Sequence, residues 1–401
     1  TTSKLAGQMK IILEKQDYSD HPAIWKNIVQ LLPDNPILRM HLARILEKEG
    51  LLKEAVEEYG ELLKIDFELN EGRIYLGGAL AKLGYCKKGI EQINLAMSKD
   101  SSLYSIAVLT CIESGEYIMK GSDFEHAIHL FQTGLQYDPN SSILRIKLAE
   151  ALFRNGDFIT ASDIFKSILL EEQASPIAEQ VILLWDDLLI ANKTPQQRVL
   201  TWREMLESIP DSSIIKEHYI LSLAASGNFK KAKTYCKESR KYFPLSLICA
   251  AIDCRLGGTK ESEKLFDLVF HNSNSAVPAK YIDFISTTAL ELIGEEKYTQ
   301  AEDMLLALEL LQPANLWHQV HLGEVLAAQK CYNEAIDRFI NILIIAPDSA
   351  HTATQLAAIY DLLSVPDRCV ADWQELVTLN PDAFIPREHL ERAENIAYSR
   401  N

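Results

Sequence analysis

The sequence of 401 residues lacks most of the features that mark membrane proteins, all-β proteins and secreted proteins. Only 17 glycines and 14 prolines are present, which is few for a loop-rich or all-β chain of this length. A membrane-spanning helix needs roughly 18 to 20 apolar residues, and the longest dense apolar run is ILII at 342–345. The N-terminus has no apolar signal-peptide core followed by a cleavage site. We therefore expect a helical protein without membrane insertion, located in the cytoplasm.

Positive charge is also in deficit. The chain has 40 Lys and Arg against 56 Asp and Glu, which gives a net charge of −16 and a pI near 5.1. Such a chain repels phosphate backbones, so nucleic acid is not an expected partner. Residues 282–381 carry 15 acidic and 4 basic residues, whereas residues 1–281 carry 37 and 33. This acidic block suggests a basic partner segment; the alternative is a solvated face that keeps the protein soluble.

Catalytic and metal-binding motifs are missing as well. The sequence contains no phosphate-binding loop, no G-x-G-x-x-G, no H-E-x-x-H and no G-x-S-x-G. Cys249 and Cys254 form only a C-x4-C, a weak zinc signal, and we interpret them as small apolar residues of a reduced protein. His318 and His321 share a helical face and are interpreted as ordinary surface residues. We expect no enzyme activity, no metal site and no cofactor.

What the sequence does contain is a repeated pattern of small, large and proline positions. Between His321 and Pro347 the slots are Leu322, Gly323, Leu326, Ala335, Phe339 and Pro347. The same slots recur 34 residues later as Leu356, Ala357, Tyr360, Cys369, Trp373 and Pro381. Further copies precede them, and the approximate repeat starts are residues 2, 36, 70, 108, 142, 179, 213, 243, 282, 316 and 350.

The spacing has a direct physical meaning. Slots three, four and seven residues apart place apolar side chains on one face of a helix. Small residues allow two helices to approach closely, the aromatic slot fills the space between them, and proline ends the second helix. On these residues the chain resembles the tetratricopeptide repeat (TPR) family over nearly its whole length. The resemblance implies an all-α fold, a right-handed superhelical solenoid of about 11 TPR-like helix-turn-helix repeats.

Two interruptions suggest a division of the array. Asp186 and Arg198 occupy slots that elsewhere hold small residues, and Gly257 and Gly258 end a short helix. We therefore expect four parts, namely an N-terminal TPR block, degenerate repeats that include a hinge, a C-terminal acidic TPR block and a capping helix. Their ranges are 1–175, 176–281, 282–381 and 382–401.

The TPR resemblance also implies that the first helix of each repeat lines a concave groove. The candidate groove residues are Arg44, Lys48, Tyr75, Lys82, Lys147, Arg154, Trp317, His321, Glu324, His351 and Gln355. Four cations, Lys48, Lys82, Lys120 and Arg154, share one register, either as an anion-binding stripe or as the ordinary residues of that position. Trp317 is either a binding anchor or a residue that packs on the preceding repeat.

These features predict a non-enzymatic scaffold or adaptor that binds a protein or peptide segment in the groove. The sequence does not begin with Met and starts almost on a repeat boundary. A second hypothesis is therefore that the chain is the recruitment or regulatory portion of a larger enzyme or of a secretion or membrane-associated assembly. The oligomeric state is left open.

Overall fold

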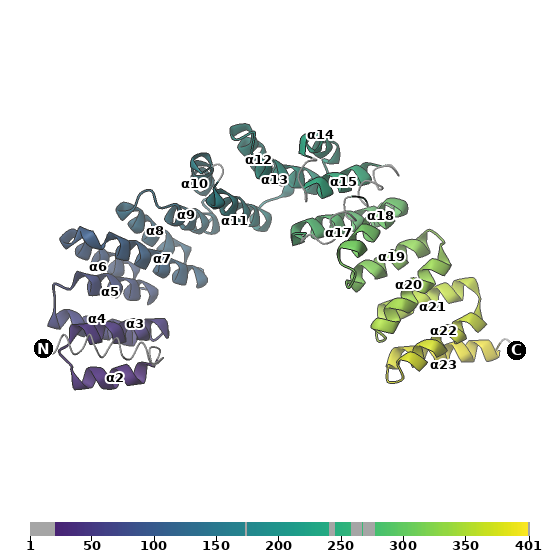
Figure 1. The fold of residues 1–401 in the computed structure, drawn as a ribbon, viewed down its shortest axis with the longest axis horizontal. Helices are drawn as coiled ribbons and strands as arrows, with labels where there is room; N and C mark the ends of the chain where they lie inside the picture. The colour runs from purple at the N-terminus through teal and green to yellow at the C-terminus, as the bar shows by residue number, and fades with distance from the viewer. Residues whose placement is uncertain (1–20, 173–174, 240–244, 258–266, 268–276, 400–401) are drawn as a thin grey trace. The chain divides into compact units, whose positions relative to one another are not determined.

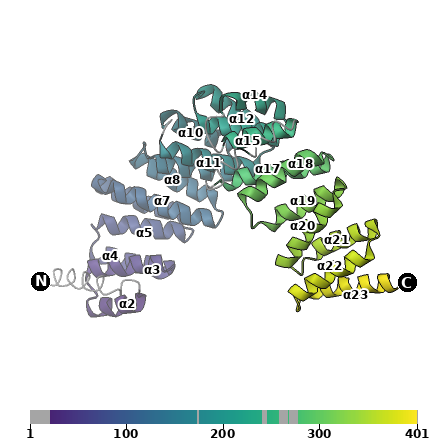
Figure 2. The same cartoon turned by 45° about the vertical axis from the view of Figure 1, so that its right-hand side comes forward.

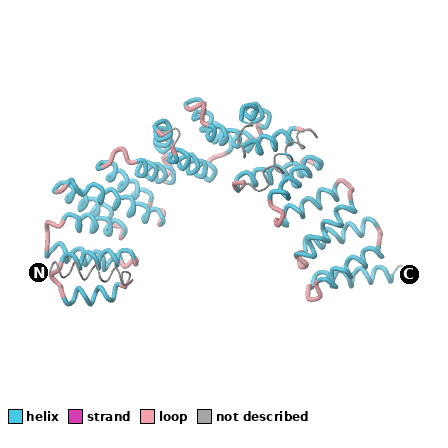
Figure 3. The backbone as a smooth tube through the Cα atoms, in the orientation of Figure 1, coloured by secondary structure: helices cyan, strands magenta, loops and turns pink. Residues whose placement is uncertain are grey.

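A computed structural model of the chain describes residues 21–172, 175–239, 245–257, 267 and 277–399. The expected fold class is confirmed, because these residues form helices and turns and contain no strand (Figure 3). The chain divides into two compact units, residues 1–194 (unit 1) and 195–401 (unit 2). Each unit is an α-helical solenoid built from successive helix pairs (Figure 1).

Unit 1 begins, in its described part, with the single helix α2 (Pro22–Leu31). Each following pair has a first helix and a second helix joined by a short turn, and each pair packs on the next. The helices are α3 (Pro36–Lys48), α4 (Leu52–Ile65), α5 (Asn70–Lys82), α6 (Cys86–Lys99), α7 (Tyr104–Lys120), α8 (Phe124–Tyr137), α9 (Ser142–Arg154), α10 (Phe158–Glu171) and α11 (Pro176–Asn192).

Local sequence sets the ends of these helices. The Asn35 side chain accepts hydrogen bonds from the backbone N–H groups of Ile37 and Leu38, and Pro36 occupies the first helical position of α3. The turn inside the same pair contains Gly50 at a φ of +76°. A left-handed residue after a helix is readily supplied by glycine, which has no Cβ to clash. This combination ends α3 sharply and lets α4 fold back against it.

The helices of a pair are held together by the slots that the repeat pattern marks. The aromatic slots Tyr59, Phe131 and Phe165 are fully buried. Helices α5 and α6 approach each other closely at Gly77 and Gly89. A Cβ built on Gly89 would lie 2.3 Å from the carbonyl oxygen of Gly77. Glycine is therefore required at this crossing for a steric reason, not for a special backbone angle.

Unit 2 continues the same arrangement. Figure 2 shows its last helices, from α19 to α23, following one another in a stack. Its helices are α12 (Pro195–Ser208), α13 (Ser213–Ala225), α14 (Phe229–Ser239), α15 (Leu245–Leu256), α17 (Ala279–Gly294), α18 (Tyr298–Leu311), α19 (Leu316–Ala328), α20 (Tyr332–Ile345), α21 (Ala350–Leu363), α22 (Pro366–Leu379) and α23 (Phe384–Ser399).

Some turns of unit 2 lack the left-handed glycine that others, such as that of Gly227, contain. Glu296, Lys330 and Ser364 take left-handed φ values of +59°, +68° and +55° in three of them, as Ser122 does in unit 1. A left-handed conformation costs a residue with a Cβ roughly 1–2 kcal/mol. These three turns are therefore held in place by the packing of the helices on either side.

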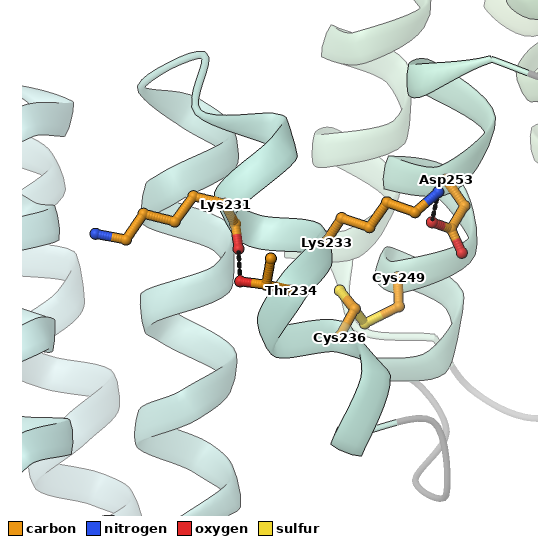
Figure 4. The surroundings of a disulfide bond; sticks show 6 residues. All are labelled: Lys231, Lys233, Thr234, Cys236, Cys249 and Asp253. Atoms are coloured by element: carbon orange, nitrogen blue, oxygen red, sulfur yellow. Dashed lines mark hydrogen bonds and ion pairs between the residues drawn. A yellow bond between two sulfur atoms is a disulfide. The ribbon is translucent and has the colours of Figure 1, made fainter.

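A disulfide joins two consecutive helix pairs in unit 2. Cys236 of α14 and Cys249 of α15 are bonded, with their Cα atoms 5.4 Å apart (Figure 4). Beside it, Lys233 Nζ lies 2.8 Å from Asp253 Oδ1, and the side chain of Asp253 is almost fully buried. The interpretation of Cys249 as a reduced apolar residue is therefore wrong. Two helices that pack face to face bring these cysteines within disulfide range, which their spacing in the sequence does not reveal.

The predicted repeat register agrees closely with the helix pairs. The starts predicted at 36, 70, 142, 213, 316 and 350 are the first residues of α3, α5, α9, α13, α19 and α21. Helix α7 begins at Tyr104, four residues before its predicted start and directly after the 3-10 turn Ser101–Leu103. The helix is 17 residues long and so has an extra turn at its N-terminal end. The predicted starts at 179 and 282 lie three residues after the first residues of α11 and α17, and those at 2 and 243 lie outside the described residues. The four predicted part boundaries stay a prediction.

Candidate functional site

The first helices of successive pairs form one layer of each unit. In unit 1 α5 contacts α3 and α7, and α9 contacts α7 and α11, while in unit 2 α19 contacts α21. We call the surface of these first helices the helix-A face. All eleven predicted groove residues belong to α3, α5, α9, α19 or α21.

On α3 and α5 the predicted residues form contacts with one another. The guanidinium carbon of Arg44 lies 4.1 Å from the centre of the Tyr75 ring, a cation–π geometry. The Tyr75 ring in turn lies 6.3 Å from that of Tyr59, the aromatic slot of α4. Burial and the nearby carboxylate of Glu71 raise the pKa of the Tyr75 hydroxyl, against the opposing effect of Arg44. Tyr75 is therefore half-buried, and Arg44 covers its exposed side.

Lys82 is not the exposed cation that an anion-binding stripe requires. Its Nζ lies 2.8 Å from Glu47 Oε1, and the side chains are only 11% and 12% exposed. The Tyr59 hydroxyl donates a hydrogen bond of 3.0 Å to the other oxygen of Glu47. Burial, with this carboxylate next, raises the pKa of Tyr59. Lys82 thus ties α5 to α3, although its Nζ also lies 5.9 Å from the ring centre of Tyr117 on α7.

Lys147 and Arg154 on α9 also lie close to carboxylates. Lys147 Nζ lies 2.6 Å from Glu116 Oε1, and Arg154 Nη2 lies 3.0 Å from Glu150 Oε1. Together with Lys120 these residues line an open pocket of about 400 Å³ between α7 and α9. Lys48 is exposed at the last turn of α3. Two of the four cations that share the register, Lys82 and Arg154, are therefore paired with carboxylates.

In unit 2 two predicted histidines converge on the carboxylate of a third predicted residue, Glu324. Glu324 Oε2 lies 3.1 Å from His321 Nδ1, and Glu324 Oε1 lies 2.6 Å from His351 Nε2. The His321 ring packs against that of Trp317 in a tilted arrangement, with 4.2 Å between the ring centres. Hydrogen bonding from His321 lowers the pKa of Glu324, burial opposes this, and His351 adds to the lowering. Gln355 is half-buried and lies on α21, four residues after His351.

The structure shows how Trp317 packs and corrects the interpretation of His318. Trp317 is half-buried and packs against the hydrophobic core of unit 2, so it contributes to packing and presents only part of its ring. His318 is not a surface residue, because its side chain is almost fully buried. Burial, with the nearby His321 next, lowers the pKa of His318, against the opposing effect of Glu309.

Sequence reasoning missed a contact that recurs across the array. The aromatic slot of a second helix touches the residue 16 positions later, on the first helix of the next repeat. The ring pairs are Trp25 with His41 at 4.1 Å, Tyr59 with Tyr75 at 6.3 Å, Trp202 with His218 at 5.1 Å and Trp373 with His389 at 4.7 Å. The spacing of 16 between aromatic residues could have identified them. Sequence reasoning also missed Tyr117 on α7, a residue that is 45% exposed.

Chemistry beyond binding has little support in the described residues. Among them, no group of three or more His, Cys, Asp or Glu side chains is placed to hold a metal ion. None of the described helices is both long and apolar enough to cross a lipid bilayer. The helix-A face also presents arginine and tyrosine side chains, which are enriched at protein interfaces.

Comparison with known proteins bears on the family. Residues 119–181, from the end of α7 into α11, match a family model described as Tetratricopeptide repeat. Tetratricopeptide repeat protein 21A of Mus musculus is 21% identical over 220 residues, which cover 51% of this chain and 16% of that protein. The matched segment thus spans less than a fifth of the length of this curated relative.

Among solved structures, the yeast Tom70 is 14% identical, with 98% of this chain and 95% of that chain covered and a TM-score of 0.33. The Cut9–Hcn1 hetero-tetramer of the APC/C is 13% identical, with 92% and 80% covered and a TM-score of 0.32. The family model, the curated relative and the 34-residue register of the helix pairs together support a tetratricopeptide repeat family for this chain.

Proposed function

We propose that this chain is a non-enzymatic scaffold that binds a segment of a partner protein along the helix-A face of unit 1. The observation that carries the proposal is the row of cation and aromatic contacts across α3, α5 and α7. Arg44 lies over Tyr75, and Lys82 lies near Tyr117, whose ring is 45% exposed. Arginine and tyrosine are enriched among the residues that dominate binding energy at protein interfaces.

The contacts within this face hold its side chains in place before a partner arrives. Lys82 is fixed by Glu47, and Tyr75 is fixed between Tyr59 and Arg44. Ordering a long side chain at an interface costs roughly 0.5–1.5 kcal/mol. A surface on which this ordering has occurred on folding binds an extended segment or a helix more tightly than a flexible one does. The same argument favours a protein partner over a small molecule, because the face is open and extends over several helices.

Affinity capture with the whole chain tests the proposal. Arg44→Ala combined with Tyr117→Ala removes a cation and an exposed aromatic ring from the helix-A face. Lys88→Ala combined with Tyr85→Ala is the matched control, because Lys88 lies 5.5 Å from the Tyr85 ring at the start of the second helix α6, and that ring is 56% exposed. A partner recovered by the wild type and the control, but lost by the first variant, supports the proposal. Recovery of no protein, or equal loss from both variants, contradicts it.

A further inference from the structure

The carboxyl ends of α20 and α22 form an exposed apolar edge in unit 2. Ile345 ends α20 and is 66% exposed, Leu379 ends α22 and is 51% exposed, and Phe384 begins α23 and is 71% exposed. Ile344 adds a further partly exposed side chain. We call these four residues the apolar edge. Large side chains on one rim of a folded unit leave apolar surface in water, which favours a partner that covers them.

Hydrogen bonds between the two turns make this edge a fixed structure. The Asn380 side chain donates to the carbonyl oxygen of Ile344 at 3.4 Å. Asp348 Oδ1 accepts the backbone N–H groups of Phe384 and Ile385 at 3.1 and 3.3 Å. Between the two turns lies an open pocket of about 310 Å³, lined by Pro347, Asp348 and the residues 379–383. The edge therefore combines exposed apolar side chains with a preformed depression.

The charge around the pocket is negative and has no cation of its own. Asp348 and Asp382 line it, and its lining contains no Lys, Arg or His. The surrounding block, residues 282–381, has a net charge of −11. Three of its four cations are already engaged with carboxylates, Lys297 with Glu295, Arg338 with Glu309 and Arg368 with Asp372. The pocket lining therefore carries two carboxylates and no cation, and Asp348 accepts two backbone N–H groups of α23.

We propose that the apolar edge binds a basic amphipathic segment of a partner protein. Apolar side chains of that segment pack on Ile345, Leu379 and Phe384, and its Lys or Arg residues pair with Asp348 and Asp382. Apolar contact supplies most of the affinity, while the charges select a basic partner and make the association salt-dependent. This surface is separate from the helix-A face of unit 1, so the inference stands apart from the proposed function.

Fluorescence anisotropy with the full chain tests this inference. The probe is a labelled helical peptide with Leu on one face and Lys on the other, and the matched peptide carries Glu in place of every Lys. We expect the Lys peptide to bind, with an affinity that falls as salt is raised, and the Glu peptide to bind about tenfold more weakly or worse.

Variants localise the binding. Ile345→Ser combined with Leu379→Ser should weaken binding of the Lys peptide by about tenfold, because both apolar contacts are lost. Ile159→Ser combined with Leu170→Ser is the control, since these α10 side chains are 78% and 48% exposed in unit 1. Unchanged binding by the control and by Arg44→Ala/Tyr117→Ala supports the inference. No binding of the Lys peptide, equal binding of both peptides, or equal losses in the edge and control variants would overturn it.

Discussion

The crossing of α5 and α6 makes a sharp prediction about stability. A Cβ added at Gly89 would lie 2.3 Å from the Gly77 carbonyl oxygen, and 3.1 Å and 3.2 Å from the backbone nitrogen and Cβ of Ala81. These are mostly backbone atoms, so no side-chain rotation relieves the overlap and the two helices must separate. Overpacking of this kind costs about 1–3 kcal/mol. Alanine is also a better helix former than glycine by about 1 kcal/mol, which offsets part of the loss.

Gly60→Ala is the matched control for Gly89→Ala. Gly60 lies inside α4, and a Cβ there would meet no atom within 4 Å. Both variants gain the same helix propensity, so the difference between their free energies of unfolding isolates the overlap, about 1–3 kcal/mol. We expect Gly60→Ala to be stabilised by up to about 1 kcal/mol and Gly89→Ala to be destabilised.

The assay combines urea unfolding, followed by circular dichroism, with hydrogen exchange measured by mass spectrometry. In a repeat array each pair contacts only its neighbours, so the loss of protection should concentrate in α5, α6 and the adjoining helices. Equal stability of Gly89→Ala and Gly60→Ala would refute the steric argument. Loss of protection away from α5 and α6 would refute the placement of the contact.

Three further substitutions test separate features of the molecule. Lys82→Ala should lower the free energy of unfolding by about 1–3 kcal/mol, because the partly buried Glu47 loses its cation. The control Lys64→Ala removes a cation that is 72% exposed and should change the free energy by no more than about 0.5 kcal/mol. Equal urea midpoints of the two variants would contradict this. Lys330→Gly relieves a left-handed residue and should stabilise by about 0.5–1 kcal/mol, which an unchanged or lower melting temperature would disprove. Folding lowers the pKa of His318. As the pH falls, this imidazole is therefore protonated in the unfolded chain before it is protonated in the folded chain, and the free energy of unfolding should fall as the pH drops through about 6.5. His318→Gln should flatten that fall in melting temperature, and an unaltered pH profile would argue against the burial.

The repeat frame could be predicted because its residues interact at fixed spacing. Gly323 and Phe339 are an example, since a Cβ on Gly323 would lie 2.5 Å from the Phe339 ring and the pattern alone pairs a small slot with an aromatic one. The start of α19 at Leu316 follows from the same register. Apolar spacing thus determines which helix faces meet, and this part of the fold is local enough to be visible in the sequence.

The candidate site could be predicted only as a set of positions. Lys82 and Glu47 come from different repeats and occupy no slot of the pattern, so their ion pair depends on how α3 and α5 pack. The contact between the rings of His321 and Trp317 follows from a spacing of four on one helix and could have been predicted from the sequence. Side-chain pairing between helices is a tertiary property, and it decides which cations remain available to a partner.

The disulfide between α14 and α15 has a mechanical consequence. A stack of helix pairs held only by neighbour contacts lengthens under tension as one pair after another is pulled apart. The bond between Cys236 and Cys249 closes a loop with a sequence separation of 13. While the bond is intact, the roughly 40 Å of extended chain within this loop would therefore not add to the length of unit 2 under tension. Force spectroscopy with and without a thiol reductant would show this as a longer unfolding step once the bond is opened.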